Sequence, residues 1–558
     1  AAASTATATS PFPATPPSRT HPAALLPIAT PATASTAAAS SPISGGTIGT
    51  AQGGTGKNGG DGIYSIDDLT IEGGKIEQAT GGNSTDATGG DGIHGDNKLT
   101  ISGGTIGTAQ GGIATADYKS GGSGIYCGDA LTISGGTIGT AKGGNANNGN
   151  GGSGIYSKGK LFISQSAKIN NATGGSSIHG GNGIFGGTTM EIAGTIKEAF
   201  GGDSTGKGIG GHGIYSKKNL TISDSAAITS AKGGDSTDGI GGSGIRSDAE
   251  LIISQSDPSQ SATSQGATIG TAKGGDGKAS GGYGIRSDGD LKIEGGTIGS
   301  LTTDDNSKQI PDPTTGALGG NAAEGENGGH GIYSKGQLFI SGSADIINAK
   351  GGDGKTSGGD GIRSDKEFNI SGGKIEQATG GNSTDGTGGY GIHSGSMLTI
   401  SDSANITNAT GGSGWSGGHG IFGTAMKIIS SAIGTAKAAK AKLPAAMAST
   451  ASASSPSPTA LSSRTLPAAT PPASMAPAAA ASSATVSSPS RAAPSTPPAA
   501  AARAAARALT ATSSPSAIPT PRWTSPQPLP TPTKPSKAAT ARRWTRSSIS
   551  RKTASWAS

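Results

Sequence analysis

The sequence has a single cysteine, no long apolar run and no initiator methionine. Cys127 cannot form an intrachain disulfide, and one cysteine provides none of the cysteine spacings that bind metals. No apolar segment is long enough to span a bilayer as a helix. The chain carries no signal peptide either. We treat it as a fragment, so the missing signal does not indicate a location.

Glycine and acidic residues are missing from both ends of the chain. All 101 glycines lie in residues 43–437, whereas residues 1–42 and 438–558 contain no glycine, aspartate or glutamate and hold 27 of the 30 prolines. These tails also hold 15 of the 42 basic residues, which leaves 27 basic and 36 acidic residues in the middle and a net charge there of −9. The net charge of +6 for the whole chain therefore comes from the tails, and it does not indicate a nucleic-acid or membrane partner.

The middle of the chain repeats itself about every 30 residues. Each unit has a Gly-Ile pair followed by Tyr, His, Phe or Arg, then a Leu-Thr-Ile-Ser run, a Gly-Gly-Thr-Ile-Gly-Thr-Ala run and a segment rich in Gly-Gly pairs. Two longer spacings mark insertions at residues 257–266 and 301–326. The anchor isoleucines are Ile63, Ile93, Ile125, Ile155, Ile184, Ile214, Ile245, Ile285, Ile332, Ile362, Ile392 and Ile421. Such self-similarity is typical of a solenoid, in which stacked repeats bury a face that one repeat could not bury alone.

Three short runs in each repeat alternate apolar and polar residues, which predicts three strands separated by turns rich in Gly, Asn, Asp and Ser. When the repeats stack, the recurring positions represented by Ile63, Leu69, Ile71, Ile76 and Ala79 would form columns in the core. The sequence therefore predicts an all-β parallel β-helix of about twelve coils. With strands about 4.8 Å apart, it would be a monomeric rod roughly 58 Å long. The alternative is an open-sided β-solenoid of another kind, because a β-propeller needs longer, four-stranded repeats.

The Ala-, Ser- and Pro-rich tails can be read as repeats translated in the wrong frame. Residues 438–459, AAKAKLPAAMASTASASSPSPT, back-translate to codons that give GGKGKASGGNGIYSIGKLTISD when one base is added in front, and residues 2–14 regroup to GGIYSDGDLTISG. Our hypothesis is that residues 1–42 and 438–558 are out-of-frame copies of the repeat; the alternative is a low-complexity linker of the mucin or cell-wall type. Both interpretations predict disordered tails, since neither tail has apolar periodicity. A gene sequence without the repeat in the other two frames would exclude the hypothesis.

The residue after each anchor isoleucine points away from the core, because side chains alternate along a strand. These residues form an outward ladder of Tyr64, His94, Tyr126, Tyr156, Phe185, Tyr215, Arg246, Arg286, Tyr333, Arg363, His393 and Phe422. Aromatic rings stack on sugar faces and arginine pairs with carboxylates through two N–H groups, so the ladder is a candidate binding surface for a linear polysaccharide. The alternative is that the rungs stack on one another and only stabilise the solenoid.

Acidic side chains in the Gly-rich segments are weak candidates for calcium ligands, since Ca²⁺ takes oxygen ligands from flexible loops. The candidates are Asp86, Asp91, Asp235, Asp238, Asp353 and Asp385. They recur once per repeat rather than in tandem nine-residue copies, which favours solvated turn residues instead. No other cofactor is indicated.

No catalytic motif is recognisable in the repeats. Six histidines lie in residues 43–437, and their scatter over different repeats indicates no ligand cluster. No Gly-x-Ser-x-Gly motif lies between a strand and a helix. The repeats are uniform, and only the two insertions offer room for a unique site. We therefore expect no enzymatic activity.

The units GGDGIHGDNKLTISGGTI (89–106) and GGSGIYCGDALTISGGTI (121–138) resemble the bacterial carbohydrate-binding-domain family of cell-surface β-helix proteins. That family, known from plant-biomass-degrading clostridia, uses units of the form DGIxxxGxLTISGGT. The resemblance covers residues 43–437 and implies a right-handed parallel β-helix that binds calcium and acidic plant polysaccharides such as polygalacturonate. The chain departs from the family by adding a Gly-Gly segment to each coil and by carrying single acidic residues beside the anchor where the family has pairs. Similar arrays occur in bacterial adhesin-like proteins.

These observations predict an extracellular or cell-surface bacterial protein that binds polysaccharide or acts as an adhesin. A structural spacer without a ligand is the second hypothesis, and a polysaccharide lyase or hydrolase of the β-helix class is the third. No nucleic-acid partner and no membrane span are expected.

Overall fold

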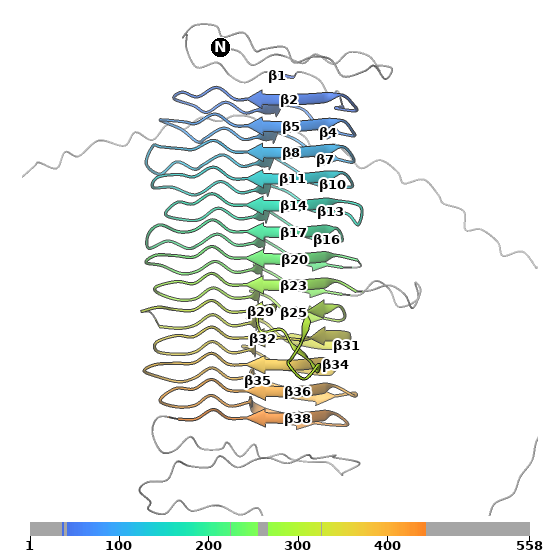
Figure 1. Ribbon diagram of the computed structural model, residues 1–558, viewed down its shortest axis with the longest axis vertical. Coiled ribbons are helices and arrows are strands. Elements are labelled where there is room, and N and C mark those ends of the chain that lie inside the picture. Colours follow the sequence, from blue (N-terminus) through green and yellow to red (C-terminus); the bar gives the residue numbers. More distant parts are fainter. Residues whose placement is uncertain (1–35, 38–41, 224, 255–265, 325, 442–558) are drawn as a thin grey trace, which may run out of the picture. The chain divides into compact units, whose positions relative to one another are not determined.

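Figure 1 shows the computed structural model, in which residues 36–37, 42–223, 225–254, 266–324 and 326–441 are described. They form an all-β parallel solenoid of about 13 turns, with about 30 residues in each turn, or coil. Each coil stacks on the previous one through parallel strand pairs. There is one more coil than there are Gly-Ile anchors, because the third strand of a further coil precedes the first anchor.

Three strands make up a coil, as the alternating runs predict. The first strands begin at the anchor isoleucine and are β3 (Ile63–Ser65), β6 (Ile93–Gly95), β9 (Ile125–Cys127), β12 (Ile155–Ser157), β15 (Ile184–Gly186), β18 (Ile214–Ser216), β21 (Ile245–Ser247), β24 (Ile285–Ser287), β30 (Ile332–Ser334) and β33 (Ile362–Ser364). The second strands are β4 (Leu69–Ile71), β7 (Leu99–Ile101), β10 (Leu131–Ile133), β13 (Leu161–Ile163), β16 (Met190–Ile192), β19 (Leu220–Ile222), β22 (Leu251–Ile253) and β25 (Leu291–Ile293).

The third strands are β2 (Thr47–Gln52), β5 (Lys75–Thr80), β8 (Thr105–Gln110), β11 (Thr137–Lys142), β14 (Lys168–Thr173), β17 (Thr195–Phe200), β20 (Ala227–Lys232), β23 (Thr268–Lys273), β26 (Thr297–Ile298), β29 (Gly316–Leu318), β32 (Ala349–Lys350), β36 (Asn405–Thr410) and β38 (Ala432–Lys437). Most third strands are six residues long and contain the small alanine, whereas β26, β29 and β32 are only two or three residues long. Toward the C-terminal end, neighbouring runs merge into β31 (Leu338–Ile346), β34 (Phe368–Thr379), β35 (Ile392–Ser401) and β37 (Ile421–Ile428). The remaining strands are β1 (Thr36–Ala37), β27 (Leu301–Thr303) and β28 (Gln309–Pro311).

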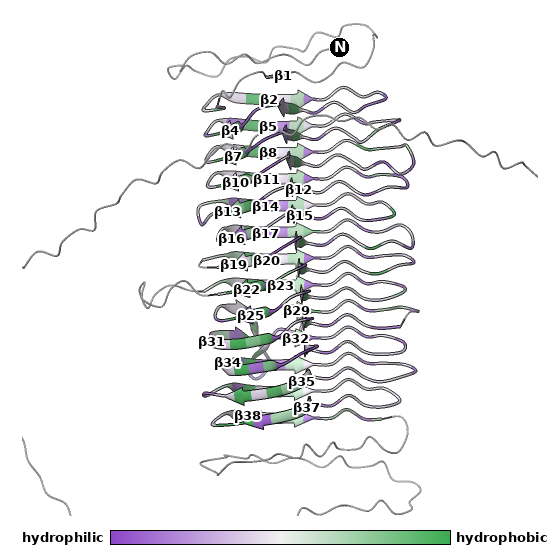
Figure 2. Cartoon of the chain, turned by 180° about the vertical axis from the view of Figure 1, so that it is seen from behind, coloured by the Kyte–Doolittle hydropathy of each residue, from purple (hydrophilic) through white to green (hydrophobic). Residues whose placement is uncertain are grey.

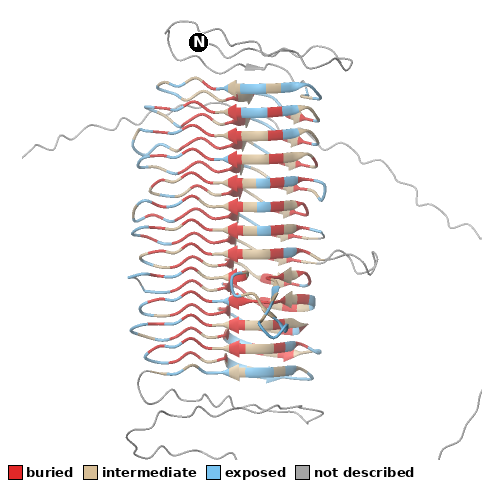
Figure 3. Ribbon diagram, in the orientation of Figure 1, coloured by how far each residue is buried: buried red, intermediate tan, exposed pale blue. Residues whose placement is uncertain are grey.

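The apolar columns predicted from the repeats form the core. Ile93 pairs with Ile125 in the next coil and Leu99 pairs with Leu131, so like residues lie above like residues. Figure 3 shows these inward positions as buried, and Figure 2 shows that the same strands carry the apolar residues. Each large apolar side chain removed from water contributes roughly 1.5–3 kcal/mol, so the stacking of coils supplies the stability that one repeat lacks.

A column of buried serines runs beside the core at the end of the first strands. Ser157 Oγ is 3.0 Å from the carbonyl oxygen of Asp129 and 3.0 Å from that of Lys160, and it is placed to donate to either. Cys127 occupies the same register position, and its Sγ donates to Asn97 O at 3.0 Å. Burial raises the pKa of the Cys127 thiol. The lone cysteine is therefore a replacement for serine in a structural column.

The Gly-rich segment of each coil leaves the core as an arm made of two Gly-Gly runs that lie against each other, on the left in Figure 1. The N–H of Gly122 donates to Gly112 O in the same arm at 2.9 Å, and the N–H of Gly112 donates to Gly90 O in the preceding coil at 2.7 Å. A Cβ on Gly122 would lie 1.9 Å from Gly90 O in the preceding arm, so no side chain fits between neighbouring arms at this position. What the sequence presents as loops is a hydrogen-bonded part of the stack.

The described insertion forms a hairpin outside the solenoid. β27 and β28 pair in antiparallel fashion, and β29 then rejoins the parallel stack. The buried Asn348 donates from Nδ2 to the carbonyl oxygens of Asp312 at 3.2 Å and Thr315 at 2.8 Å, which ties the base of the hairpin to the next coil. The other insertion, at residues 257–266, lies outside the described residues except for its last residue.

A few described tail residues pair with the neighbouring coils, and the out-of-frame hypothesis stays a prediction. In β1, Thr36 lies opposite Tyr64 and Ala37 lies opposite Ser65. Ala441 forms a bridge to Gly414 in the preceding coil. The rest of both tails lies outside the described residues.

Candidate functional site

The twelve predicted ladder residues lie in one register column, each opposite the next along the stack. Their rings stack on one another. The centroids of Tyr126 and Tyr156 are 5.2 Å apart with the planes at 5°, and those of Tyr156 and Phe185 are 4.7 Å apart with the planes at 18°. Such pairs contribute roughly 0.5–1.5 kcal/mol each beyond their burial. The rungs thus cover much of one another's ring faces.

The three arginine rungs are each paired with aspartates of the chain. Arg246 lies 2.8 Å from Asp248 and 2.9 Å from Asp288, and Arg286 lies 2.6 Å from the same Asp288. Arg363 is paired in the same manner. A guanidinium held by carboxylates has less unbalanced charge to offer an acidic ligand, because that ligand must compete with the aspartates.

A second column, which the sequence did not reveal, lies beside the ladder. It consists of the residue two positions before each anchor isoleucine. Its members are Asp61, Asp91, Ser123, Ser153, Asn182, His212, Ser243, Tyr283, His330, Asp360, Tyr390 and His419. Several of these side chains accept a hydrogen bond from the backbone of the next coil, as Asn182 Oδ1 does from the N–H of His212 at 2.9 Å and His212 Nδ1 does from that of Ser243 at 2.8 Å. The residue type changes from repeat to repeat, so no periodic signal marks the column.

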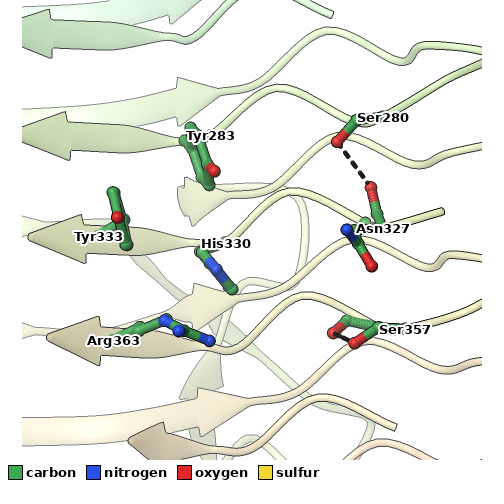
Figure 4. A pocket seen from close by; sticks show the side chains of 9 residues that line it. Ser280, Tyr283, Asn327, His330, Tyr333, Ser357 and Arg363 are labelled. Atoms are coloured by element: carbon green, nitrogen blue, oxygen red, sulfur yellow. Dashed lines mark hydrogen bonds between the residues drawn. The ribbon is translucent and has the colours of Figure 1, made fainter. Parts of the chain in front are cut away.

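A half-open hollow of about 300 Å³ lies where both columns carry aromatic residues. Its lining residues are Ser280, Tyr283, Asn327, Gly328, His330, Tyr333, Ser357, Gly358 and Arg363. Tyr283 stacks on Tyr333 of the next coil, with centroids 5.0 Å apart and planes at 13°, and on His330 at 5.3 Å. Figure 4 shows the ring and arginine side chains on one side and the serine and asparagine side chains on the other. The hollow therefore combines an aromatic wall with a polar one.

Charges in the wall of the hollow are balanced within the protein. Burial lowers the pKa of His330 to about 4, and its Nδ1 accepts a hydrogen bond from the N–H of Asp360 at 2.7 Å, so the neutral ring carries its proton on Nε2. Burial opposes the charge on Arg363, but Asp360, at 3.3 Å, and Asp365, at 2.8 Å, outweigh it and raise its pKa. Burial and a 2.6 Å hydrogen bond to Asp365 raise the pKa of Tyr333.

His94 lies between two carboxylates elsewhere in the two columns. Its Nδ1 is 3.2 Å from Asp61 Oδ2 and 2.9 Å from Asp91 Oδ2, and its Nε2 is 3.0 Å from Asp96 Oδ1. Burial disfavours the charged ring, but Asp61 and Asp91 outweigh it and raise the pKa of His94 to about 10. In the part of the chain that the structure describes, Asp61, Asp91 and His94 are the one group of three such side chains close enough to hold a metal ion.

Only one of the six histidines lies in this group, so the prediction that the histidines form no ligand cluster stays a prediction, but the sequence analysis did not anticipate that His94 lies beside two aspartates. The signal was present in the sequence as an aspartate three residues before His94, in Asp-Gly-Ile-His, together with an aspartate at the same place one repeat earlier. It becomes visible only when neighbouring repeats are placed one above the other, because Asp61 is far from His94 along the chain.

The other predicted calcium candidates make contacts typical of turn residues. Asp235 and Asp353 each accept a hydrogen bond from a backbone N–H of the next coil, at 2.8 and 2.6 Å. Asp238 and Asp385 lie 3.3 and 3.9 Å from lysine ammonium groups. Asp86 is exposed. Calcium binding by these residues stays a prediction.

No family model, curated protein or solved structure matches the chain. The family resemblance is accordingly supported only as far as a β-solenoid fold. Among the residues that the structure describes, no helix is long and apolar enough to cross a membrane. Function therefore has to be argued from the geometry of the two columns and the hollow.

Proposed function

We propose that the chain is a non-catalytic extracellular or cell-surface protein that binds a linear polysaccharide, with the hollow at Tyr283 as its main contact. The observation that supports this role is the pairing of an aromatic wall, formed by Tyr283 and Tyr333, with a polar wall across about 300 Å³. Sugars have apolar C–H faces and many hydroxyl groups, so they suit a site with rings on one side and hydrogen-bonding groups on the other.

A neutral polysaccharide fits this hollow better than an acidic one. Arg363, the one cationic side chain in the lining, is already paired with Asp360 and Asp365. His330 is uncharged at neutral pH because its pKa is lowered by burial. An acidic plant polysaccharide, as the family resemblance implies, would have to displace an aspartate from Arg363, which costs the energy of an existing ion pair.

The lining also favours binding without catalysis. None of its nine residues is an aspartate or glutamate, whereas most glycoside hydrolases place two carboxyl groups on either side of the bond they cleave. Binding of surface glycans through repeated coils is compatible with a role as an adhesin.

The proposal is tested by applying the full chain to an array of neutral and acidic glycans, with and without Ca²⁺, and measuring Kd for the best ligand by calorimetry. Tyr283→Ser introduces the residue that occupies this register position at Ser243, so the coil should still fold. We expect it to weaken binding about tenfold, the effect of losing roughly 1.4 kcal/mol of ring contact. Tyr390→Ser, in the same column but outside the hollow, is the matched control and should change Kd much less.

Three results would contradict the proposal. The first is that no glycan is retained, and the second is that the two tyrosine variants lose affinity equally. The third is that retained glycan is shortened, which would favour a lyase or hydrolase of the β-helix class.

A structural spacer is the second candidate function, because the rungs of the ladder outside the hollow are occupied with one another. The ring pairs from Tyr64 to Tyr215 have centroid separations of 4.5 to 5.3 Å in stacked, tilted or edge-to-face arrangements, which are the contacts expected of a ladder that only stabilises coils. Failure of the full chain to bind any glycan on the array would favour this role.

A further inference from the structure

We propose that Asp61, Asp91 and His94 form a binding site for a first-row divalent transition metal, for which Zn²⁺ is the reference ion. Asp61 belongs to one coil, and Asp91 and His94 belong to the next, so a bound ion would join two neighbouring coils near the N-terminal end of the described solenoid. The site is distinct from the hollow at Tyr283 and does not depend on glycan binding.

Both carboxylates are held so that one oxygen of each faces His94. Asp61 Oδ1 accepts a hydrogen bond from the N–H of Asp91 at 2.6 Å, and Asp91 Oδ1 accepts one from the N–H of Ser123 at 2.5 Å. The two Oδ2 atoms are thereby directed at His94 Nδ1. Two donor atoms, one from each carboxylate, are thus oriented by backbone hydrogen bonds of the second column before any ion binds.

The separations between these donor atoms match a four-coordinate site. Zn²⁺ binds nitrogen and carboxylate oxygen at about 2.0–2.1 Å, and two ligands at the corners of a tetrahedron of that size are about 3.3 Å apart. His94 Nδ1 lies 3.2 Å from Asp61 Oδ2 and 2.9 Å from Asp91 Oδ2. Small adjustments of the side chains would complete three corners, and the partly exposed edge of the cluster leaves the fourth corner open to water.

The alternative is a protonated His94 held between two carboxylates, which the raised pKa of the ring favours when no ion is bound, so a metal ion would have to replace the proton on Nδ1. The geometry of the contacts nevertheless suits an ion. Nδ1 of His94 is buried, yet neither nearby oxygen lies where its N–H would make a hydrogen bond of acceptable geometry. An imidazolium is expected to direct its buried N–H at one carboxylate oxygen. Oxygens that flank the ring nitrogen off its axis are what coordination to a shared ion produces.

The far side of the imidazole ring has the outer contact that metal-binding histidines usually make. Nε2 of His94 lies 3.0 Å from Asp96 Oδ1, and the other oxygen of Asp96 accepts a hydrogen bond from the hydroxyl of Tyr64 at 2.6 Å. A carboxylate in this position fixes the tautomer that leaves Nδ1 free to bind the ion. Asp96 is therefore a positioning residue for the site.

The ligand set favours a transition metal over calcium. Imidazole is a good ligand for zinc and its neighbours in the first row, whereas Ca²⁺ takes six to eight oxygen ligands. The cluster offers one ring nitrogen and two carboxylates, which is too few oxygens for calcium, while each ligand is of a type that binds zinc.

A related cluster further along the stack serves as an internal control. Asp360 Oδ2 lies 2.9 Å from His393 Nδ1, but Arg363 Nη1 lies 3.3 Å from the same oxygen. The guanidinium brings a positive charge to the carboxylate that a metal would need, so this cluster should bind no ion. His393→Tyr is accordingly a substitution of the same kind outside the proposed site.

The test is equilibrium dialysis of the chelator-treated full chain against micromolar Zn²⁺, with metal counted by mass spectrometry and folding checked by circular dichroism. We expect one Zn²⁺ per chain. His94→Tyr places tyrosine where the next rung, Tyr126, already has it, and should weaken binding at least tenfold while the ladder stays intact. Asp96→Asn should weaken it about tenfold through loss of the outer carboxylate. His393→Tyr should bind Zn²⁺ as the parent does.

Cobalt provides a second readout, because Co²⁺ in a four-coordinate nitrogen and oxygen site absorbs visible light more strongly than hydrated Co²⁺. That absorption should appear with the parent chain and disappear with folded His94→Tyr. The proposal is overturned if Zn²⁺ does not bind, if folded His94→Tyr binds it as tightly as the parent, or if Ca²⁺ displaces it at equal concentration. Binding lost equally in His94→Tyr and His393→Tyr would also overturn it.

Discussion

Alanine at Gly122 is expected to disrupt the stacked arms of the solenoid. A Cβ there would lie 1.9 Å from Gly90 O, and real Cβ atoms essentially never approach closer than 3.0 Å, so the backbone has to move by roughly 1 Å. The N–H of Gly122 donates to Gly112 O at 2.9 Å, and the carbonyl oxygen of Gly122 accepts from the N–H of Gly144 at 2.7 Å. A backbone shift of about 1 Å breaks both hydrogen bonds.

The cost of the substitution follows from those two bonds. Each contributes about 0.5–1.5 kcal/mol net, and each buried group left without a partner costs about 1–3 kcal/mol. A local loss of about 3 kcal/mol or more is therefore expected. It should be confined to a few coils, since each repeat of a solenoid contacts only its neighbours.

Hydrogen exchange followed by mass spectrometry measures this loss where it occurs. Peptides that contain the amides of residue 122 and Gly144, which donate these two bonds, should exchange on the order of 100-fold faster in Gly122→Ala, which corresponds to about 3 kcal/mol. Gly206→Ala is the control, because its Cβ would meet only Ile178 Cγ1 at 4.0 Å. If Gly122→Ala exchanges no faster than Gly206→Ala, the close approach of the Gly-Gly runs does not hold the arms together.

Two further predictions concern buried polar groups. Cys127→Ser should change the free energy of unfolding by less than about 1 kcal/mol, because serine fills this column at Ser157. Cys127→Val should lower it by about 1–3 kcal/mol, because the carbonyl of Asn97 is left without a partner. Equal urea midpoints for the two variants would contradict this reasoning. Burial, aided by Arg246, lowers the pKa of His212 to about 3. Between pH 6.5 and 4.5 the unfolded chain therefore binds a proton that the folded chain does not. The free energy of unfolding should decrease by about 2–3 kcal/mol as the pH is lowered over this range. His212→Asn keeps an acceptor for the N–H of the next coil, as Asn182 does. Its free energy of unfolding, measured in urea, should decrease by about 2–3 kcal/mol less than that of the parent chain between pH 6.5 and 4.5. Identical pH profiles for the two chains would refute the assignment.

The core and the ladder could be predicted because their residue types recur. Ile93 over Ile125 repeats the same letter at the same spacing, and the residue after it is Tyr, His, Phe or Arg each time. A period of about 30 residues with three alternating runs leaves few folds to choose from. Contact between the rungs was one of two alternatives that the sequence left open, and it is favoured by a strand spacing close to the separation of stacked rings.

The arms and the second column could not be predicted in the same way. Gly-Gly pairs have no side chains, so a stack of close backbones gives no apolar pattern and resembles a set of flexible loops. Positions such as Asn182, His212 and Tyr283 share only an ability to fill one register position, mostly as hydrogen-bond acceptors, and no single residue type marks them. The hollow and the His94 cluster depend on which residues happen to meet in neighbouring coils, and this requires the register.

The most direct test of the proposed function is a hydrogen-exchange map of the full chain with and without the best neutral oligosaccharide from the array. The proposal predicts that saturating ligand slows exchange in peptides covering residues 280–283, 327–333 and 357–363, which line the hollow. Peptides covering residues 390–393, from the same two columns outside the hollow, should be unchanged. Slowed exchange away from the hollow, or none at a ligand concentration well above Kd, would contradict the assignment.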